Sequence, residues 1–228
     1  MAVNYGAPPI VTDGLIFAVD PQSKRSYISG STTVTDMIGS QQLTATTIYN
    51  VPDSSYWYIN SANDVFKKTG TDILLSFSTQ ITMIAWWNRQ GTGVYGRLLE
   101  MYYPGATYTH GHSLAIDSDG SVRGWMDRNG AGYSRVLELD DATTYTSGWH
   151  MLSYTYNGST ARLYVDGQQT VTGAGSYSDL DDVSNIAIGG ATANYYADAF
   201  IGPVQVYNRG LSAEEVLQNY NALKGRFA

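Results

Sequence analysis

The sequence predicts an all-β protein, a sandwich of two antiparallel sheets with one short helix near the C-terminus. Short runs of alternating apolar residues are separated by Gly, Asn, Asp and Ser roughly every ten residues, as antiparallel strands and their turns require. Hydrophobic residues make up 43% of the 228 positions and charged residues 14%, which supplies a core and excludes a disordered chain. A sandwich of this length commonly forms one domain, so we expect a single domain over residues 11–228 and an extended arm over residues 1–10.

The clearest local signal is a strand that leads into a capped helix at the C-terminal end. Ile201–Tyr207 is rich in β-branched and aromatic residues and is predicted to be a strand. Ser212 with Glu215 three residues later forms a capping box, so a helix is expected over Ser212–Leu223, with Gly225 as its C-terminal cap. The apolar stripe expected to pack on the sandwich consists of Val216, Leu217, Tyr220 and Leu223.

Asn157-Gly158 predicts a β-hairpin with a two-residue type I′ turn. Its strands are expected over His150–Tyr156 and Ser159–Asp166, with their apolar residues on one face. The expected pairs are Tyr154 with Ala161, Leu152 with Leu163, and His150 with Val165.

Asp117-Ser-Asp-Gly120 predicts a second hairpin. A two-residue loop would mix apolar and polar residues on each face. A three-residue loop with Gly120 in the left-handed region avoids this mixing. The expected pairs are Ile116 with Val122, and Leu114 with Gly124.

The N-terminal segment differs from the rest of the chain. Gly6-Ala-Pro-Pro9 favours an extended, polyproline-like path, because proline cannot donate a ladder hydrogen bond. This segment is either a frayed terminus or an arm that lies along a neighbouring subunit. Tyr5 is the one large side chain before Ile10 with which such an arm can make contacts.

Several segments carry a family resemblance: Gly14–Asp20 with Lys24–Tyr27, Ile81–Trp87, Gly148–Gly167 and Phe200–Gly225. Together they resemble the laminin-G-like branch of the concanavalin A-like lectin/glucanase superfamily over nearly the whole chain. The resemblance implies a two-sheet jelly-roll sandwich. Variants with this opening and a Leu-Ser-Ala-Glu-Glu ending are, as the resemblance implies, frequent among virion proteins of tailed phages, especially those of cyanobacteria.

Composition excludes several classes of partner. The net charge of −7, with 13 Lys and Arg and no basic run, makes nucleic acid an unfavourable partner. The absence of cysteine removes disulfide and thiol chemistry. No apolar run approaches the ~20 residues of a membrane span, and Met1–Pro9 has neither the basic nor the apolar region of a signal peptide. The resemblance implies a fold usually found on extracellular surfaces, and no export signal is visible. Together these lead us to expect a virion protein made in the host cytoplasm, or otherwise an extracellular one.

The carboxylates do not predict an enzyme. As the resemblance implies, glycosidases of this superfamily place two glutamates and an aspartate at alternate positions of one strand, and this chain has no such triplet. The glutamates are Glu100, Glu138, Glu214 and Glu215. The last two belong to the helix cap, and Glu100 has no acidic residue at 98 or 102. We interpret Glu100 as a solvated or Arg97-paired strand residue and assign no catalytic residue.

The histidines are interpreted as structural. His110 and His112 alternate as metal ligands on a strand can, but no acidic residue or cysteine accompanies them, so we interpret them as a solvent-facing loop pair. His150 is expected to face the core with both ring nitrogens hydrogen-bonded.

Calcium is the one cofactor that the resemblance raises, since some members of the superfamily bind it at the sandwich rim through aspartate and backbone oxygens. The available groups are Asp117 with Asp119, Asp140 with Asp141, and Asp179 with Asp181 and Asp182. None has the register of a dedicated calcium loop, and aspartates in turns mostly form Asx-turns. We therefore assign no metal ligand and keep calcium as an alternative.

Nineteen tyrosines are the compositional oddity of this chain. Rings on loops stack on sugars or anchor protein interfaces, whereas many tyrosines simply occupy strands. The tyrosines in Gly-, Ala- and Thr-rich segments, together with Tyr5, are the candidate ligand- or partner-binding residues: Tyr102, Tyr103, Tyr108, Tyr133, Tyr195 and Tyr196.

From these features we expect a non-enzymatic virion structural protein, first as a capsid decoration or adhesion protein and second in a tail fibre. The expected partners are the capsid shell or other virion proteins, a second copy of the chain, and a host-surface glycan. The alternative is a carbohydrate-binding module that acts at a cell or glycan surface. A glycoside-active enzyme is the third interpretation, and the missing carboxylate pair argues against it.

Overall fold

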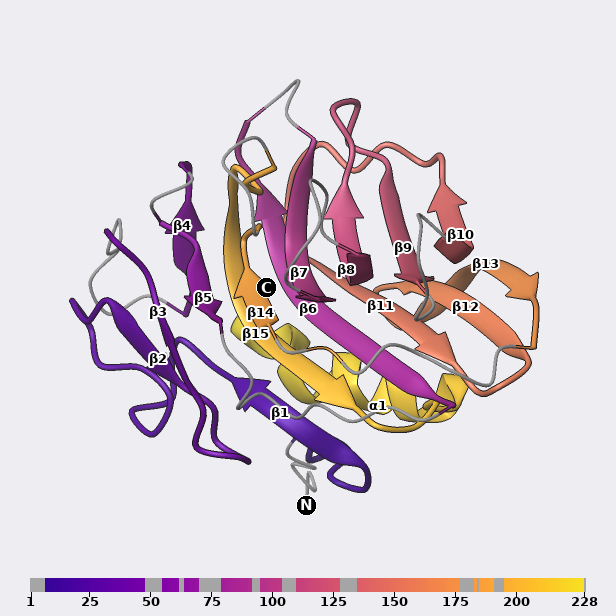
Figure 1. Cartoon of the computed structure of the whole chain (residues 1–228), viewed down its shortest axis with the longest axis horizontal. Coiled ribbons are helices and arrows are strands. Elements are labelled where there is room, and N and C mark those ends of the chain that lie inside the picture. Colours follow the sequence, from indigo (N-terminus) through magenta and orange to yellow (C-terminus); the bar gives the residue numbers. More distant parts are fainter. Residues whose placement is uncertain are drawn as a thin grey trace, which may run out of the picture.

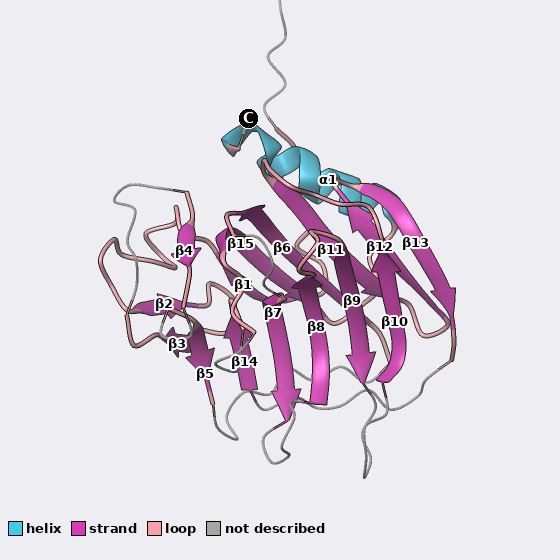
Figure 2. Cartoon of the chain, turned by 90° about the horizontal axis from the view of Figure 1, so that it is seen from above, coloured by secondary structure: helices cyan, strands magenta, loops and turns pink. Residues whose placement is uncertain are grey.

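The computed structural model describes residues 7–47, 55–61, 64–69, 79–91, 95–103, 110–127, 135–176, 183, 185–190 and 195–227. In these ranges fifteen strands form two sheets in which every pair of neighbouring strands is antiparallel, and the sheets face each other (Figures 1 and 2). The all-β sandwich predicted from the sequence is confirmed.

The first sheet, sheet A, contains in spatial order β1 (Leu15–Val19), β15 (Ala199–Tyr207), β6 (Ile81–Arg89), β11 (His150–Tyr156), β12 (Thr160–Val165) and β13 (Gln168–Ala174), and β4 (Trp57–Ile59) also pairs with β15. The second sheet, sheet B, contains β10 (Arg135–Asp141), β9 (Val122–Asp127), β8 (His110–Ile116), β7 (Gly96–Tyr103), β14 (Asn185–Ile188), β5 (Phe66–Lys68), β3 (Gln42–Thr44) and β2 (Thr33–Thr35).

The strand β6 is buried on both faces, which explains its nearly continuous apolar sequence. Met83 and Trp87 belong to the main core between the sheets. Ile84 and Trp86 belong to a second core between sheet A and the C-terminal helix. Sheet A is therefore the middle layer, with sheet B on one face and the helix on the other (Figure 2).

The helix α1 (Ala213–Leu223) begins as predicted. Ser212 is the N-cap, its Oγ accepts from the Glu215 backbone N–H at 3.3 Å, and the Glu215 carboxylate accepts from the Ser212 N–H at 2.9 Å. The predicted C-terminal cap is wrong, because the chain continues into a short 3₁₀ helix, η1 (Lys224–Arg226), which contains Gly225. The capping box is thus confirmed, but the glycine does not stop the helix.

The predicted apolar stripe is only partly correct. Val216 is fully buried and Tyr220 stacks on Trp86 with ring centroids 5.6 Å apart, but Leu217 is 37% exposed. Asn219 is fully buried instead, and its side-chain amide forms hydrogen bonds with Val11, which precedes β1, and with Tyr207 on β15.

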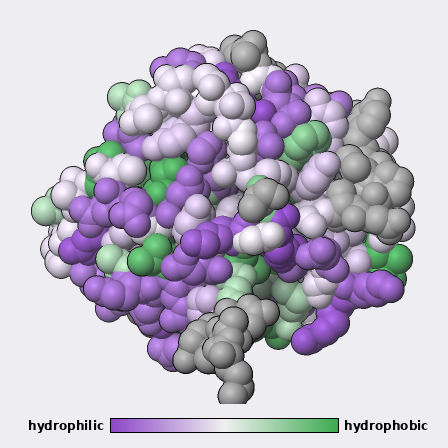
Figure 3. Space-filling model, turned by 180° about the vertical axis from the view of Figure 1, so that it is seen from behind, coloured by the Kyte–Doolittle hydropathy of each residue, from purple (hydrophilic) through white to green (hydrophobic). Residues whose placement is uncertain are grey.

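The face of the molecule that carries α1 is largely hydrophilic, with hydrophobic residues in separate small areas (Figure 3). No helix in the described ranges has the length and apolar composition of a membrane-spanning segment.

The hairpin between β8 and β9 has the predicted register. Ile116 pairs with Val122, Leu114 pairs with Gly124, and Gly120 has a φ of 94°. The three-residue loop is therefore confirmed.

The hairpin between β11 and β12 differs from the prediction. Each β11 residue pairs two positions further along β12, so that Tyr154 is opposite Leu163. Gly158 has a φ of 95° and lies, with Ser159, between Asn157 and Thr160, which are joined by a backbone bond of 3.2 Å. Glycine at the first central position is typical of a type II′ turn, not of the type I′ turn that we predicted. A shift of two keeps the same side chains on the same face, so the core assignment is unaffected.

The described end of the N-terminal segment runs along α1. Residues 7–10 form no strand, and the Pro9 carbonyl accepts from the Gln218 amide at 2.8 Å. The proposed binding role of the arm stays a prediction, since Tyr5 lies outside the described residues.

Candidate functional site

The outer face of sheet B carries two arginines on either side of a small residue. Arg97 on β7 pairs with Ala115 on β8, which pairs in turn with Arg123 on β9. A β-bulge between Arg97 and Leu99 also turns Glu100 to this outer face, where regular alternation would place it on the opposite face from Arg97. The bulge thus brings Arg97 and Glu100 together, and the two side chains form an ion pair.

Aromatic rings cover both arginines. The Arg97 guanidinium carbon lies 4.8 Å from the ring centroid of Tyr195 and 5.5 Å from that of Trp125. Tyr95 contacts Tyr195 edge-to-face at 5.5 Å, and the Arg123 guanidinium carbon lies 5.6 Å from the Tyr95 ring. These distances are those of cation–π and edge-to-face aromatic pairs. We call this group the arginine–aromatic cluster: Tyr95, Arg97, Arg123, Trp125 and Tyr195.

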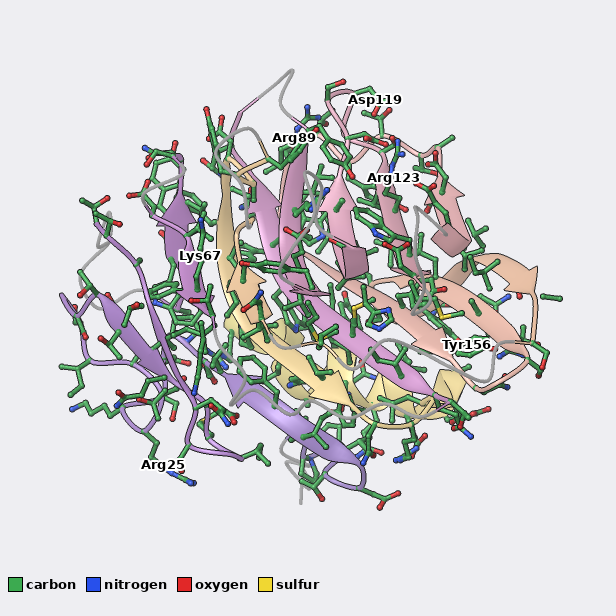
Figure 4. All side chains as sticks on the ribbon, in the orientation of Figure 1. Arg25, Lys67, Arg89, Asp119, Arg123 and Tyr156 are labelled. Atoms are coloured by element: carbon green, nitrogen blue, oxygen red, sulfur yellow. The ribbon has the colours of Figure 1, made fainter. Side chains whose placement is uncertain are left out.

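Three carboxylates surround Arg123. Its Nε donates to Asp117 at 2.8 Å, one terminal nitrogen donates to Glu138 at 3.0 Å, and Asp140 lies 3.8 Å away. Burial alone would lower the pKa of Arg123, but the bonds to Asp117 and Glu138 outweigh burial and raise it. Arg123 therefore holds the carboxylates of Asp117 and Glu138 in fixed positions. It lies at the same end of the sandwich as Arg89 and Asp119 (Figure 4).

The arginine–aromatic cluster contains both a buried ring and side chains that are accessible to solvent. Trp125 is buried, whereas Tyr95, Tyr195 and Arg123 are half-exposed. Rings beside fixed hydrogen-bonding groups suit a ligand with apolar C–H faces and many hydroxyls, which is the chemistry of a saccharide.

Glu100 has no second carboxylate at a catalytic distance on its row of sheet B. It is 2% exposed, and its cross-strand neighbours are Ser113 and Ala187. The same row continues through Trp125 to Glu138, which is three strands away, or about 14 Å at the usual strand spacing. Glycosidase carboxylates lie about 5–10 Å apart. Of the two interpretations of Glu100, the Arg97-paired one is confirmed and the solvated one is wrong, because the pair is buried.

The structure separates the tyrosines that the sequence singled out. Tyr195 and Tyr196 lie between β14 and β15 and are half-exposed, but only Tyr195 joins the cluster, since Tyr196 packs against the main core. Tyr102 is not on a loop: it is a strand residue of β7, opposite Gly111, and only 8% exposed. Tyr103 ends β7, and its side chain lies outside the described part. Tyr5, Tyr108 and Tyr133 also lie outside the described residues.

The sequence analysis did not identify four of the five cluster residues as binding candidates. For one of the four, Tyr95, the sequence does contain a pattern that could have identified it. Tyr95 lies in Gly93-Val-Tyr-Gly96, a glycine-rich context like those used to select the other tyrosines. Arg97, Arg123 and Trp125 had no such signal, because only the strand register and the bulge bring them together.

The histidines have different environments. His112 is not solvent-facing: it lies within β8 and is fully buried, because position 112 faces the core like Leu114. The side chain of His110, which begins β8, lies outside the described part. His150 is half-buried, and its two ring nitrogens lie 2.8 Å from Asp166 Oδ2 and 3.3 Å from the Ser147 carbonyl oxygen. The structural role predicted for His150 is confirmed.

The His150–Asp166 pair predicts a pH dependence of stability. The hydrogen bond to Asp166 raises the pKa of His150 above its ordinary value of about 6.5, and burial opposes this only in part. A raised folded-state pKa gives stabilisation that is complete below pH 6.5 and is lost as the pH rises through the folded-state pKa. We expect the melting temperature to fall as the pH rises above about 6.5, and His150→Gln to remove that part of the fall. Parallel curves for the two proteins would contradict this.

The aspartates considered for calcium that lie in the described ranges already have partners. Asp119 accepts from the Ser121 N–H at 2.9 Å, and Asp141 accepts from the Thr143 N–H at 3.0 Å, which are the Asx-turn bonds expected of turn aspartates. Asp117 and Asp140 lie beside Arg123. Asp179, Asp181 and Asp182 lie outside the described residues, and the described ranges hold no group of three or more His, Asp or Glu residues placed to bind a metal.

Comparisons with known proteins agree with this architecture. A model of the laminin-G type 3 family, described as concanavalin A-like lectin/glucanases superfamily, matches residues 54–217. No curated protein matches the sequence.

The chain is also similar to several solved structures. Trypanosoma rangeli sialidase in complex with sialic acid superposes with a TM-score of 0.71 at 16% identity, over 97% of this chain and 36% of the sialidase. The binding domain of botulinum neurotoxin DC in complex with SialylT gives 0.66 at 14% identity, over 93% of this chain and 52% of that domain. The binding domain of Paraclostridial Mosquitocidal Protein 1 gives 0.65 at 16% identity, over 92% and 52%. The chain thus spans about a third to a half of these proteins, and at such identities the likeness shows a shared fold.

Proposed function

Because the chain belongs to the laminin-G type 3 family of the concanavalin A-like lectin/glucanase superfamily, we propose that it is a non-enzymatic recognition domain that binds a saccharide through the arginine–aromatic cluster. The observation that carries this proposal is the half-exposed Tyr95–Tyr195 pair, which lies beside the carboxylates held by Arg123. Ring faces contact the C–H surface of a sugar, while fixed carboxylates accept hydrogen bonds from its hydroxyls.

The arrangement around Glu100 supports binding without turnover. General acid catalysis needs a carboxyl whose proton can be shared with the substrate and a second carboxyl within reach. Glu100 is instead buried in an ion pair with Arg97, and Glu138 bonds Arg123. The two glutamates of this row are thus both held by arginines.

A binding experiment with the intact chain tests the proposal. We expect a glycan array to identify a ligand, and titration calorimetry to show that Tyr195→Ala weakens its binding by about tenfold. Tyr58→Ala is the matched control: Tyr58 is a half-exposed tyrosine of sheet A whose ring lies 5.0 Å from Phe200. An equal loss of binding affinity in both variants, or no loss of affinity in Tyr195→Ala, would show that the cluster is not the binding site.

We also propose that this recognition takes place on the surface of a tailed-phage particle, first as capsid decoration. Support comes from the opening Gly14–Asp20 segment, which contains β1, and from the Leu-Ser-Ala-Glu-Glu ending, which caps α1; both resemble virion proteins. Quantitative mass spectrometry of purified particles from the source should find the chain at the copy number of the capsid lattice. A copy number equal to that of the tail fibres would instead indicate a tail protein. If the chain is absent from the particles, the alternative of a carbohydrate-binding module that acts elsewhere would remain.

A further inference from the structure

A groove of about 340 Å³ lies at the β2–β3 end of sheet B, away from the arginine–aromatic cluster. Its floor is polar. Thr33 and Thr35 alternate along β2 with the fully buried Val34, so both threonines face outward, and Gln42 on β3 pairs with Thr35. The floor therefore presents two hydroxyls and an amide to a ligand.

One wall of the groove is the segment that precedes β2. The Thr35 N–H donates to the Ser26 carbonyl at 2.7 Å, and Tyr27 forms a bridge with Val34, which fixes this wall beside the floor. Lys24 and Arg25 are exposed on the wall and line the groove. Ile28, which also lines the groove, is 71% exposed and offers an apolar contact.

The charge of this groove is unusual for an acidic chain. Within the described part of the chain neither Lys24 nor Arg25 makes an ion pair, and no Asp or Glu lines the groove. The nearby Asp20 is already bonded by Arg226 at 2.7 Å, and Asp36 is buried, where it accepts from backbone N–H groups. The two cations therefore remain available for a negatively charged ligand.

A second groove of similar size provides the contrast. It lies between the β11–β12 hairpin and the start of α1, has a volume of about 380 Å³, and is lined by one arginine, Arg162, and one carboxylate, Glu215. Its formal charge is therefore balanced, whereas the groove beside β2 carries two positive charges in a chain with a net charge of −7.

We propose that the groove beside β2 is a binding site for an acidic saccharide, a sugar that carries a carboxylate or a sulfate group. Lys24 and Arg25 bind the anionic group by charge-assisted hydrogen bonds. Thr33, Thr35 and Gln42 bond the sugar hydroxyls. The site goes beyond the proposed function, because Arg25 and Arg123 of the arginine–aromatic cluster lie at opposite ends of the molecule (Figure 4).

Titration calorimetry with three probes tests this inference on the full chain. The probes are a heparin-derived tetrasaccharide, its desulfated N-acetylated form, which keeps the carboxylates, and neutral chitotetraose. We expect at least one anionic probe to bind at least tenfold more tightly than chitotetraose, and more weakly at high salt. Loss of binding on desulfation would identify sulfate as the recognised group, and retention would identify the carboxylate.

Matched variants separate a built site from general electrostatic attraction. The double variant Lys24→Gln with Arg25→Gln should weaken binding of the anionic probe by about tenfold. Arg25→Gln alone should weaken it more than Arg162→Gln, which removes the same charge from the other groove. Tyr58→Ala, which lies in neither site, should leave it unchanged. Loss of probe binding in Tyr195→Ala but not in Arg25→Gln would place the probe at the arginine–aromatic cluster and overturn the inference, so failure of this site and failure of the cluster remain distinguishable. Equal effects of Arg25→Gln and Arg162→Gln, or no preference for either anionic probe, would overturn the inference.

Discussion

Replacing Glu100 with alanine is expected to lower the free energy of unfolding by about 3–5 kcal/mol. Both members of the Arg97–Glu100 ion pair are buried, with Arg97 9% and Glu100 2% exposed. Removing the carboxylate takes the opposite charge away from the buried Arg97 guanidinium, in a site with little access to water. The desolvation that Glu100 compensates is the source of the loss. Chemical denaturation of the wild type and the variant measures the difference.

Two further variants show whether the pair itself is responsible. Arg97→Met combined with Glu100→Leu should recover most of the lost stability, because apolar residues of similar volume need no charge compensation. Asp13→Ala is the control: Asp13 lies 3.0 Å from Arg209, its side chain is 88% exposed, and its loss should cost no more than about 0.5 kcal/mol. If Glu100→Ala costs as little as Asp13→Ala, the buried pair described above does not exist in solution.

Asn219→Leu is expected to destabilise the fold by about 2–4 kcal/mol. The Asn219 side chain accepts from the Val11 N–H at 2.8 Å and donates to the Tyr207 hydroxyl at 3.0 Å, and that hydroxyl donates to the Val11 carbonyl at 2.9 Å. Burial raises the pKa of Tyr207 to about 12, which keeps this donor protonated. Leucine would leave the buried Val11 N–H without its acceptor and the buried Tyr207 hydroxyl without the hydrogen bond from the amide.

The neighbouring Asn221 supplies the matched substitution. It lies on the same helix, is half-exposed, and is not part of the Val11–Tyr207 network, so Asn221→Leu should change stability by less than about 1 kcal/mol. Thermal and urea unfolding of both variants compare the two positions directly. Similar losses at positions 219 and 221 would show that the network does not fasten the start of the domain to α1.

The two hairpins show what the sequence can and cannot specify. The β8–β9 register was predictable because only one loop length kept apolar residues opposite each other. For β11–β12, the apolar faces are the same in two registers that differ by two residues, so the pattern could not distinguish them. The turn decided the register, since Gly158 and not Asn157 adopts the positive φ.

The candidate site was less predictable than the fold. Tyr195 was identified from its glycine- and alanine-rich surroundings. Its contact with Arg97 accompanies a backbone hydrogen bond from the Arg97 N–H to the Tyr195 carbonyl, which joins segments far apart in the chain and which no local sequence pattern indicates. Asn219 shows the same limit, because a polar residue on the buried face of a helix is explained only by partners about 200 and 12 residues away in the chain.

The most direct test of binding without hydrolysis is mass spectrometry of the glycan recovered after prolonged incubation with the protein. A glycan that binds in calorimetry and is bound more weakly by Tyr195→Ala should be recovered at its original length. Shortened products from the wild-type protein that disappear with Glu100→Gln would contradict the account, because they would make the buried glutamate a catalytic residue.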